Sequence, residues 1–190
     1  LPEMPPEGEF ILWQGPPHWW ALAKDSLNLW WVAGYFGAVF VWRAIAGTAS
    51  MPLSDSLAFA ALFLIMGAVV CLILALVAFV QAKATVYTIT NKRVAMRIGA
   101  ALTMTLNLPY TWIGTAKLDL KSSGHGTLAF ELIGETRISY LMSWPHVRPW
   151  RIARTQPALR CIPDAQSVAQ IFAEAAETRI SEPRDGRIET

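Results

Sequence analysis

The sequence has few of the residues that catalytic and metal sites need. It contains two cysteines, Cys71 and Cys161, and three histidines, His18, His125 and His146, none of them in a metal-ligand spacing such as His-x-x-x-His. It also has no nucleophile elbow, no glycine-rich phosphate loop and no Cys-x-x-Cys pair. These absences predict a chain with no disulfide framework and no metal or cofactor site.

The acidic residues do not indicate catalysis either. Asp119, Glu131 and Glu135 fall on predicted strand exteriors or turns, where solvated surface charges are far commoner than acid–base groups. We therefore expect a protein that is not an enzyme.

Charge is absent from one long stretch of the chain. Leu57–Val80 runs for 24 residues without a charged, amide or proline residue. As a helix it would extend about 36 Å, which exceeds the roughly 30 Å hydrocarbon core of a bilayer. An earlier apolar run, Leu27–Ile45, contains one charged residue, Arg43, near its end. We expect two membrane spans within residues 26–81, joined by the connection Gly47–Asp55.

Basic residues flank the two spans on one side. Lys24 precedes the first span, and Lys83, Lys92, Arg93 and Arg97 follow the second, whereas the connection has no lysine or arginine. By the positive-inside rule both termini are predicted to be cytoplasmic. The chain shows no basic leader or cleavage pattern before the first span, so we expect that span to persist rather than to be a signal peptide.

Tryptophan is unusually frequent near the first span. The chain has nine tryptophans. Tryptophan at both ends of a span is typical of the membrane interface. The residues predicted to lie there are Trp19, Trp20, Trp30, Trp31, Trp42 and the neighbouring Arg43. The alternative for these tryptophans is stacking against a pigment or a partner helix.

The region after the spans is basic. Residues 83–160 contain eleven lysines or arginines and three acidic residues. Attraction to an anionic membrane surface is the favoured interpretation. Nucleic-acid binding is not expected, because the basic residues are scattered and no recognition motif accompanies them.

Alternating apolar and polar residues predict six antiparallel strands after the spans. Their approximate ranges are 85–90, 93–98, 103–108, 117–121, 128–132 and 138–142. Turn residues at Asn91-Lys92, Gly99–Ala101, Gly124–Gly126 and Gly134-Glu135 separate them. Glu9–Trp13 is a further predicted strand, which can join the others because the hairpin of spans returns the chain to the side it left.

A helical segment is predicted from Pro163-Asp164 to Ile180, with Asp164 as the N-cap, because Val168, Ile171, Phe172 and Ala175 recur at helical spacing. The predicted fold is an α+β membrane protein, in which a two-helix transmembrane hairpin carries a cytoplasmic, pleckstrin-homology-like barrel or sandwich. That domain has seven antiparallel strands and a C-terminal helix. The predicted regions are an N-terminal strand and interfacial segment (1–25), the hairpin (26–81), the domain (83–180) and a disordered tail (181–190).

Several motifs resemble known families. Gly8–Gly15 and Tyr87–Val94 resemble the bacterial pleckstrin-homology domain of small membrane proteins. Met96–Gly99, Met104–Pro109 and Trp144–Arg151 resemble the PuhB family of photosynthetic-complex assembly proteins of purple bacteria. This resemblance implies no catalytic residues. It implies a role in assembling the photosynthetic reaction centre and its core light-harvesting complex (LH1) in the bacterial inner photosynthetic membrane.

One segment after the last predicted strand combines aromatic, proline and arginine residues, which are common at binding hot spots. Trp144, His146, Arg148, Trp150 and Arg151 are therefore predicted to contact a partner. The resemblance implies that this partner is a reaction-centre subunit or an LH1 polypeptide. The alternative is that Trp144 caps the domain core and the arginines contact lipid headgroups. The alternative function is that of a lipid-sensing, membrane-anchored adaptor. Whether the chain also forms a homo-oligomer is left open by the sequence.

Overall fold

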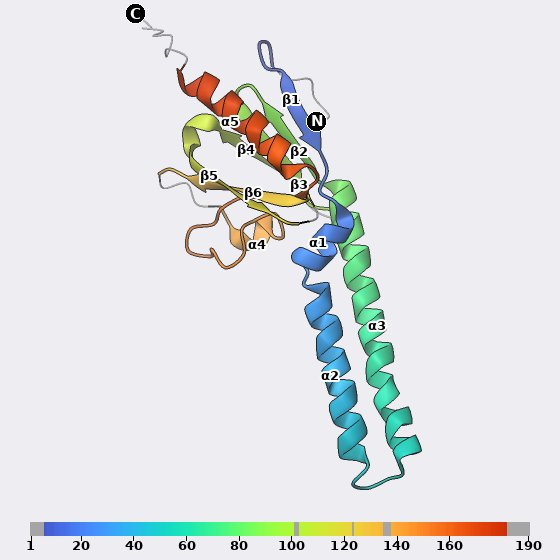
Figure 1. Cartoon of the computed structure of the whole chain (residues 1–190). Coiled ribbons are helices and arrows are strands. Elements are labelled where there is room, and N and C mark those ends of the chain that lie inside the picture. The colour runs from blue at the N-terminus through green and yellow to red at the C-terminus, as the bar shows by residue number, and fades with distance from the viewer. Residues whose placement is uncertain (1–5, 101–102, 123, 135–137, 182–190) are drawn as a thin grey trace, which may run out of the picture. The chain divides into compact units, whose positions relative to one another are not determined.

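The computed structural model describes residues 6–100, 103–122, 124–134 and 138–181 and divides into two compact units (Figure 1). One unit is formed by residues 19–80, and the other combines residues 1–18 with residues 81–190. In sequence, the second unit is thus interrupted by the first. The predicted tail lies outside the described residues, except for Ser181, which ends a helix.

Three helices make up the unit of residues 19–80. A short helix, α1 (Trp19–Asp25), precedes α2 (Leu29–Gly47) and α3 (Leu53–Ala84). Both α2 and α3 are long and apolar enough to cross a membrane. Their lengths of about 28 Å and 48 Å compare with a hydrocarbon core of about 30 Å. The two predicted spans are therefore helices, with α3 longer than expected at both ends, whereas α1 was not predicted.

Small residues let α2 and α3 approach each other. A Cβ atom built on Gly67 of α3 would lie 2.6 Å from the Cβ atom of Phe36 on α2. Near the connection, the Ser56 hydroxyl donates a hydrogen bond of 2.7 Å to the carbonyl oxygen of Ala44. Most of the other side chains on both helices are apolar, and many of them are exposed. A helix that is apolar on all sides and not buried in protein suits a lipid environment.

In the described part of the other unit, seven strands form two antiparallel sheets. The first sheet has the order β1 (Ile11–Gly15), β2 (Val86–Thr90), β3 (Arg93–Ile98) and β4 (Met104–Pro109). The second has the order β5 (Ile113–Leu120), β6 (Gly126–Leu132) and β7 (Ala158–Ile162). A short 3-10 helix, η1 (Tyr110–Trp112), links the sheets. In the described residues, no strand pairing joins the two sheets.

The N-terminal strand pairs with β2, as the sequence predicted, although it spans residues 11–15 rather than 9–13. Its register runs from Ile11 opposite Thr90 to Gly15 opposite Tyr87. Just before it, the carboxylate of Glu9 accepts two hydrogen bonds of 2.9 Å from Arg93 and one of 2.8 Å from Thr90. The interactions with Arg93 and Thr90 outweigh the opposing effect of burial and lower the pKa of Glu9.

The strand predicted at 138–142 is wrong. Tyr140–Ser143 forms a single helical turn, α4, and the last strand is β7, about twenty residues further along the chain. The alternation of Ile138, Tyr140 and Met142 resembled a strand with one buried face, yet Met142 is 72% exposed. All five residues of β7 are buried, so β7 lacks the alternation that identifies a strand with one exposed face.

The core lies between the two sheets and the terminal helix α5 (Ala165–Ser181), which confirms the predicted helix. The buried residues of α5 follow helical spacing, and Phe172 is central among them. Its ring centroid lies 5.0 Å from that of Phe130 on β6 and 5.6 Å from that of Tyr110 on η1. In Figure 1 the strands of the second sheet lie between α5 and α4.

Candidate functional site

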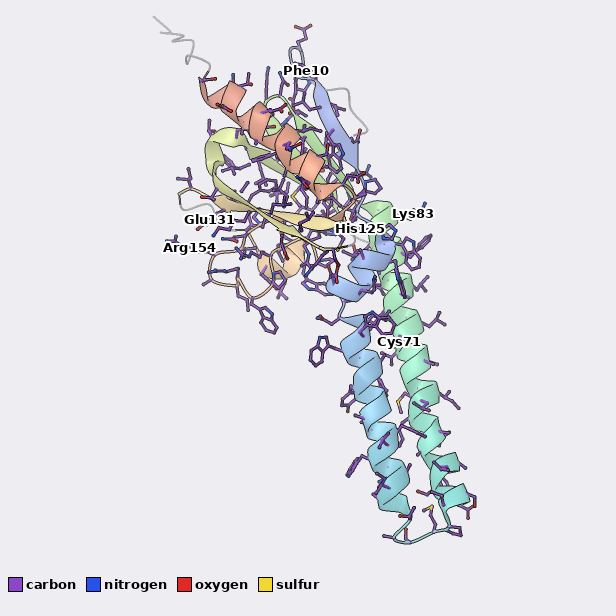
Figure 2. All side chains as sticks on the ribbon, viewed as in Figure 1. Phe10, Cys71, Lys83, His125, Glu131 and Arg154 are labelled. Carbon is purple, nitrogen blue, oxygen red and sulfur yellow. The ribbon has the colours of Figure 1, made fainter. Side chains whose placement is uncertain are left out.

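The connection between β6 and β7 carries an unusual set of exposed side chains. Its apolar residues are exposed by 86% at Leu141, 72% at Met142, 45% at Trp144, 91% at Trp150 and 69% at Ile152. Arg151 and Arg154 are also exposed, and Arg148 is partly exposed. Figure 2 labels Arg154 on this connection. We call these eight residues the 141–154 surface.

A buried histidine holds the first part of the connection in place. His146 is 1% exposed. Its Nδ1 atom lies 2.6 Å from the hydroxyl oxygen of Tyr87, and its Nε2 atom lies 3.2 Å from the Oγ1 atom of Thr85. The Tyr87 oxygen also accepts a 3.3 Å hydrogen bond from the backbone N–H of Arg160. We therefore assign the Tyr87 proton to the bond with Nδ1 and a proton on Nε2 to the bond with Thr85.

This environment keeps His146 neutral. Burial, with a smaller effect of the Arg160 charge, lowers the pKa of His146 to about 3. Burial also raises the pKa of Tyr87. The Arg160 side chain donates a 3.0 Å hydrogen bond to the carbonyl oxygen of Val147. His146 and Arg160 therefore fasten the connection to β2 and β7.

Further hydrogen bonds close the connection at the residues that flank its exposed part. The backbone N–H of Arg148 donates to the carbonyl oxygen of Gln156 at 2.9 Å, and that of Ala158 donates to His146 at 3.0 Å. The Arg148 guanidinium also donates to the Gln156 side chain at 3.2 Å. We call residues 143–148 and 156–158 the base and residues 149–155 the tip. The base is fixed to the domain, whereas the tip projects from it.

The five residues predicted to contact a partner fall into two groups. Trp144, Trp150 and Arg151 are exposed and Arg148 is partly exposed, so a contact through them stays a prediction. His146 instead faces the domain interior, where its role is structural.

Other members of the 141–154 surface were missed by the sequence reasoning. Leu141 and Met142 had been assigned to the wrong strand, and Ile152 and Arg154 lie just beyond the predicted segment. One signal in the sequence could have revealed them, because residues 136–163 contain no acidic residue.

The residues predicted at the membrane interface lie on α1 and α2. Trp19 and Trp20 are on α1, and Lys24 lies 5.8 Å from the centre of the Trp20 ring. The α2 tryptophans are more exposed, by 65% at Trp30, 80% at Trp31 and 65% at Trp42. Arg43 follows Trp42 and is exposed as well. Their contact with the membrane interface stays a prediction.

Two of the three histidines meet in space although they are far apart in the sequence. The rings of His18 and His125 lie 4.5 Å apart between centroids. In the part of the chain that the structure describes, no group of three or more histidine, cysteine, aspartate or glutamate residues is placed to hold a metal ion.

Comparison with known proteins identifies the family. Residues 33–176 match the model of the family described as "Bacterial PH domain". The chain therefore belongs to the bacterial pleckstrin-homology domain family, whose fold is typical of adaptors rather than enzymes. The matched residues include most of α2 and all of α3.

A relative and a solved structure are also similar to the chain. An uncharacterized 23.7 kDa protein of Rhodobacter capsulatus, named for its place in the 5′ region of puhA, is 44% identical over 191 residues, which cover 97% of this chain and 87% of the relative. A DUF1696 family protein with a pleckstrin-homology domain, from Shewanella loihica, is 13% identical with a TM-score of 0.33, covering 48% of this chain and 71% of that protein.

Proposed function

We propose that this chain is a non-enzymatic assembly factor of the PuhB type for the photosynthetic reaction centre and LH1. The observation that carries the proposal is the relative in Rhodobacter capsulatus, whose name places it beside the photosynthesis gene puhA and which is similar along almost the whole chain. The motifs that resemble the PuhB family agree with this assignment.

The structure supports an adaptor that works at the membrane. Its fold belongs to a family of membrane-associated or lipid-associated adaptors, and two apolar helices provide a membrane anchor. The exposed sides of α2 and α3 offer apolar surface to the helices of reaction-centre subunits or LH1 polypeptides. Outside the membrane, Trp144, Trp150 and Arg151 are accessible to a protein subunit or to lipid.

The proposed location is the bacterial inner photosynthetic membrane, with two spans and both termini in the cytoplasm. Single cysteines at Gln14, Ser54 and Gly124, in a background that lacks Cys71 and Cys161, test this topology. A membrane-impermeant maleimide added from outside should label only the cysteine at Ser54. Labelling of the cysteine at Gln14 from outside would contradict the topology.

Co-purification tests the proposed function. The tagged chain, isolated from photosynthetically grown cells in mild detergent, should retain reaction-centre or LH1 polypeptides. A matched control carries the same tag on a variant with the sequence of α2 scrambled, which keeps its composition and length. Recovery of lipid alone with the intact chain would instead favour a lipid-sensing adaptor. That second candidate is suggested by the exposed arginines beside apolar residues at the tip.

A further inference from the structure

We propose that the 141–154 surface docks onto the interfacial region of an anionic lipid bilayer. Trp150 and Ile152 enter the headgroup region, while Arg151 and Arg154 bind lipid phosphates. This inference goes beyond the assembly function, because it concerns how the domain contacts the membrane and not which proteins it helps to assemble.

The exposed apolar side chains of the 141–154 surface suit a lipid interface. Trp150 is the most exposed of the large apolar side chains in the described residues, at 91%, and Leu141 follows at 86%. These side chains project from one turn of helix and a loop. Tryptophan beside aliphatic residues is typical of segments that rest in the headgroup layer.

The charge of the surface complements an anionic membrane. Residues 136–163 contain no acidic residue. In the described part of the chain, neither Arg151 nor Arg154 takes part in an ion pair, whereas Glu131, the acidic residue labelled on β6 in Figure 2, is paired with Lys117 at 3.6 Å. Both exposed guanidinium groups are therefore available to phosphate oxygens, which they bind in a bidentate manner.

The backbone presents the tip in a defined conformation. Trp150 has a φ of 63°, in the left-handed region that bulky residues rarely adopt. Such strain persists only where the surrounding structure enforces it, and it is most frequent at functional sites. The hydrogen bonds between Arg148 and Gln156 close the loop on either side of this residue. A tip ordered before binding loses less conformational entropy when it docks.

Lipid is favoured over a protein subunit as the occupant. β2 begins two residues after the end of α3, so a membrane-spanning α3 keeps the domain close to a bilayer at all times. Such tethering makes docking effectively intramolecular.

The test uses the full chain reconstituted in nanodiscs of phosphatidylcholine alone or with phosphatidylglycerol. Cysteines replace Trp150 or Ile152, and Thr115→Cys on the exposed part of β5 is the matched control. Each variant is labelled with the environment-sensitive dye nitrobenzoxadiazole. The wild type retains the buried Cys161 and Cys71 within α3, so its labelling gives the background signal. Circular dichroism confirms that each variant is folded.

With phosphatidylglycerol, the dye at positions 150 and 152 should shift to the blue, brighten severalfold and be quenched by doxyl-labelled lipids. The dye at position 115 should not respond. Arg151→Gln combined with Arg154→Gln should lower the docking equilibrium constant on the order of 20-fold, because each arginine near an anionic surface contributes about fivefold. High salt should weaken docking in the same direction.

Two results would overturn the proposal. In the first, the dye at position 150 responds to phosphatidylglycerol no more than the dye at position 115. In the second, it responds only when purified reaction-centre–LH1 complex is added, which would make the surface a protein contact. Both results are independent of whether the chain promotes assembly, since that is measured by the amount of pigment–protein complex in cells.

Discussion

The base and the tip of the β6–β7 connection are adjacent in sequence and opposite in character. At the base, His146 is 1% exposed and both of its ring nitrogens lie within hydrogen-bonding distance of hydroxyl groups. Four residues later, Trp150 at the tip is 91% exposed. The base therefore stabilises the fold of the connection, whereas the tip is accessible from outside the domain. One segment that stands out as a unit in the sequence thus contains residues with separate roles.

The largest expected effect of a substitution is at the base. His146→Ala leaves a cavity and two buried hydroxyl groups without their partner, so the free energy of unfolding should fall by about 3–5 kcal/mol. Trp150→Ala should change it by less than about 0.5 kcal/mol. Urea unfolding of both variants in nanodiscs measures the two effects. Equal losses would remove the distinction between base and tip.

As the pH falls, the domain should lose the stability contributed by His146 before it loses that contributed by the Glu9–Arg93 pair. Because His146 stays neutral to about pH 3 in the folded state, the unfolded state binds more protons below its ordinary pKa of 6.5. The contribution of neutral His146 to the free energy of unfolding is therefore fully present above pH 6.5. It decreases as the pH falls from 6.5 toward about 3. Glu9, whose ordinary pKa is 4.5 and is lowered by folding, adds a loss only below that value.

Unfolding measured from pH 7 to 5 isolates the contribution of His146. The wild type should lose stability across this range, and His146→Gln should lose less. His18 and His125 are retained in both proteins, so the difference between the two curves reports on position 146. Parallel curves for the two proteins would show that His146 is not held in its neutral form by the fold.

A smaller effect is expected from the hydroxyl group of Tyr87. Tyr87→Phe keeps the buried ring but removes the hydrogen bonds to His146 and to the backbone of Arg160. The free energy of unfolding should fall by about 1–3 kcal/mol. Thermal unfolding measures it, and Tyr35→Phe, at an exposed position on α2, is the matched control.

A smaller loss of stability than that of Tyr87→Phe is expected where the base meets the tip. Gln156→Ala removes the 3.2 Å side-chain hydrogen bond from Arg148 but leaves the backbone bond intact. Stability should decrease by about 0.5–1 kcal/mol, while amide exchange at residues 149–155 should become faster. Unchanged exchange at the tip would show that this side chain does not order it.

Much of the fold was predictable because its signals are local. The alternation in β3 and β4 and the apolar spacing in α5 depend on which face of each element is buried, and both were recognised. β7 was missed because the connection covers it: the isolated bridge of Val147 with Pro157 and the bond from Ala158 to His146 lie alongside it. Because all five residues of β7 are buried, its sequence has no alternation of apolar and polar residues that would reveal a strand.

The candidate site was predictable only in part, because the position of some of its residues depends on distant parts of the chain. Trp150 and Arg151 were selected for their chemistry, which does not depend on the fold. Whether His146 points inward depends on Thr85 and Tyr87, which are about sixty residues away in sequence. Composition cannot reveal such a contact. The exposure of Leu141 likewise follows from α4 taking the place of the predicted strand.

The most direct test of the proposed function is the amount of reaction centre and LH1 in membranes of photosynthetic cells that lack this chain. Absorbance spectra of isolated membranes measure both complexes, and restoring the intact gene provides the control. The account predicts that both complexes decrease in the deletion strain and recover on restoration, while free pigment is still made. Normal amounts of both complexes without the chain would contradict its role as an assembly factor.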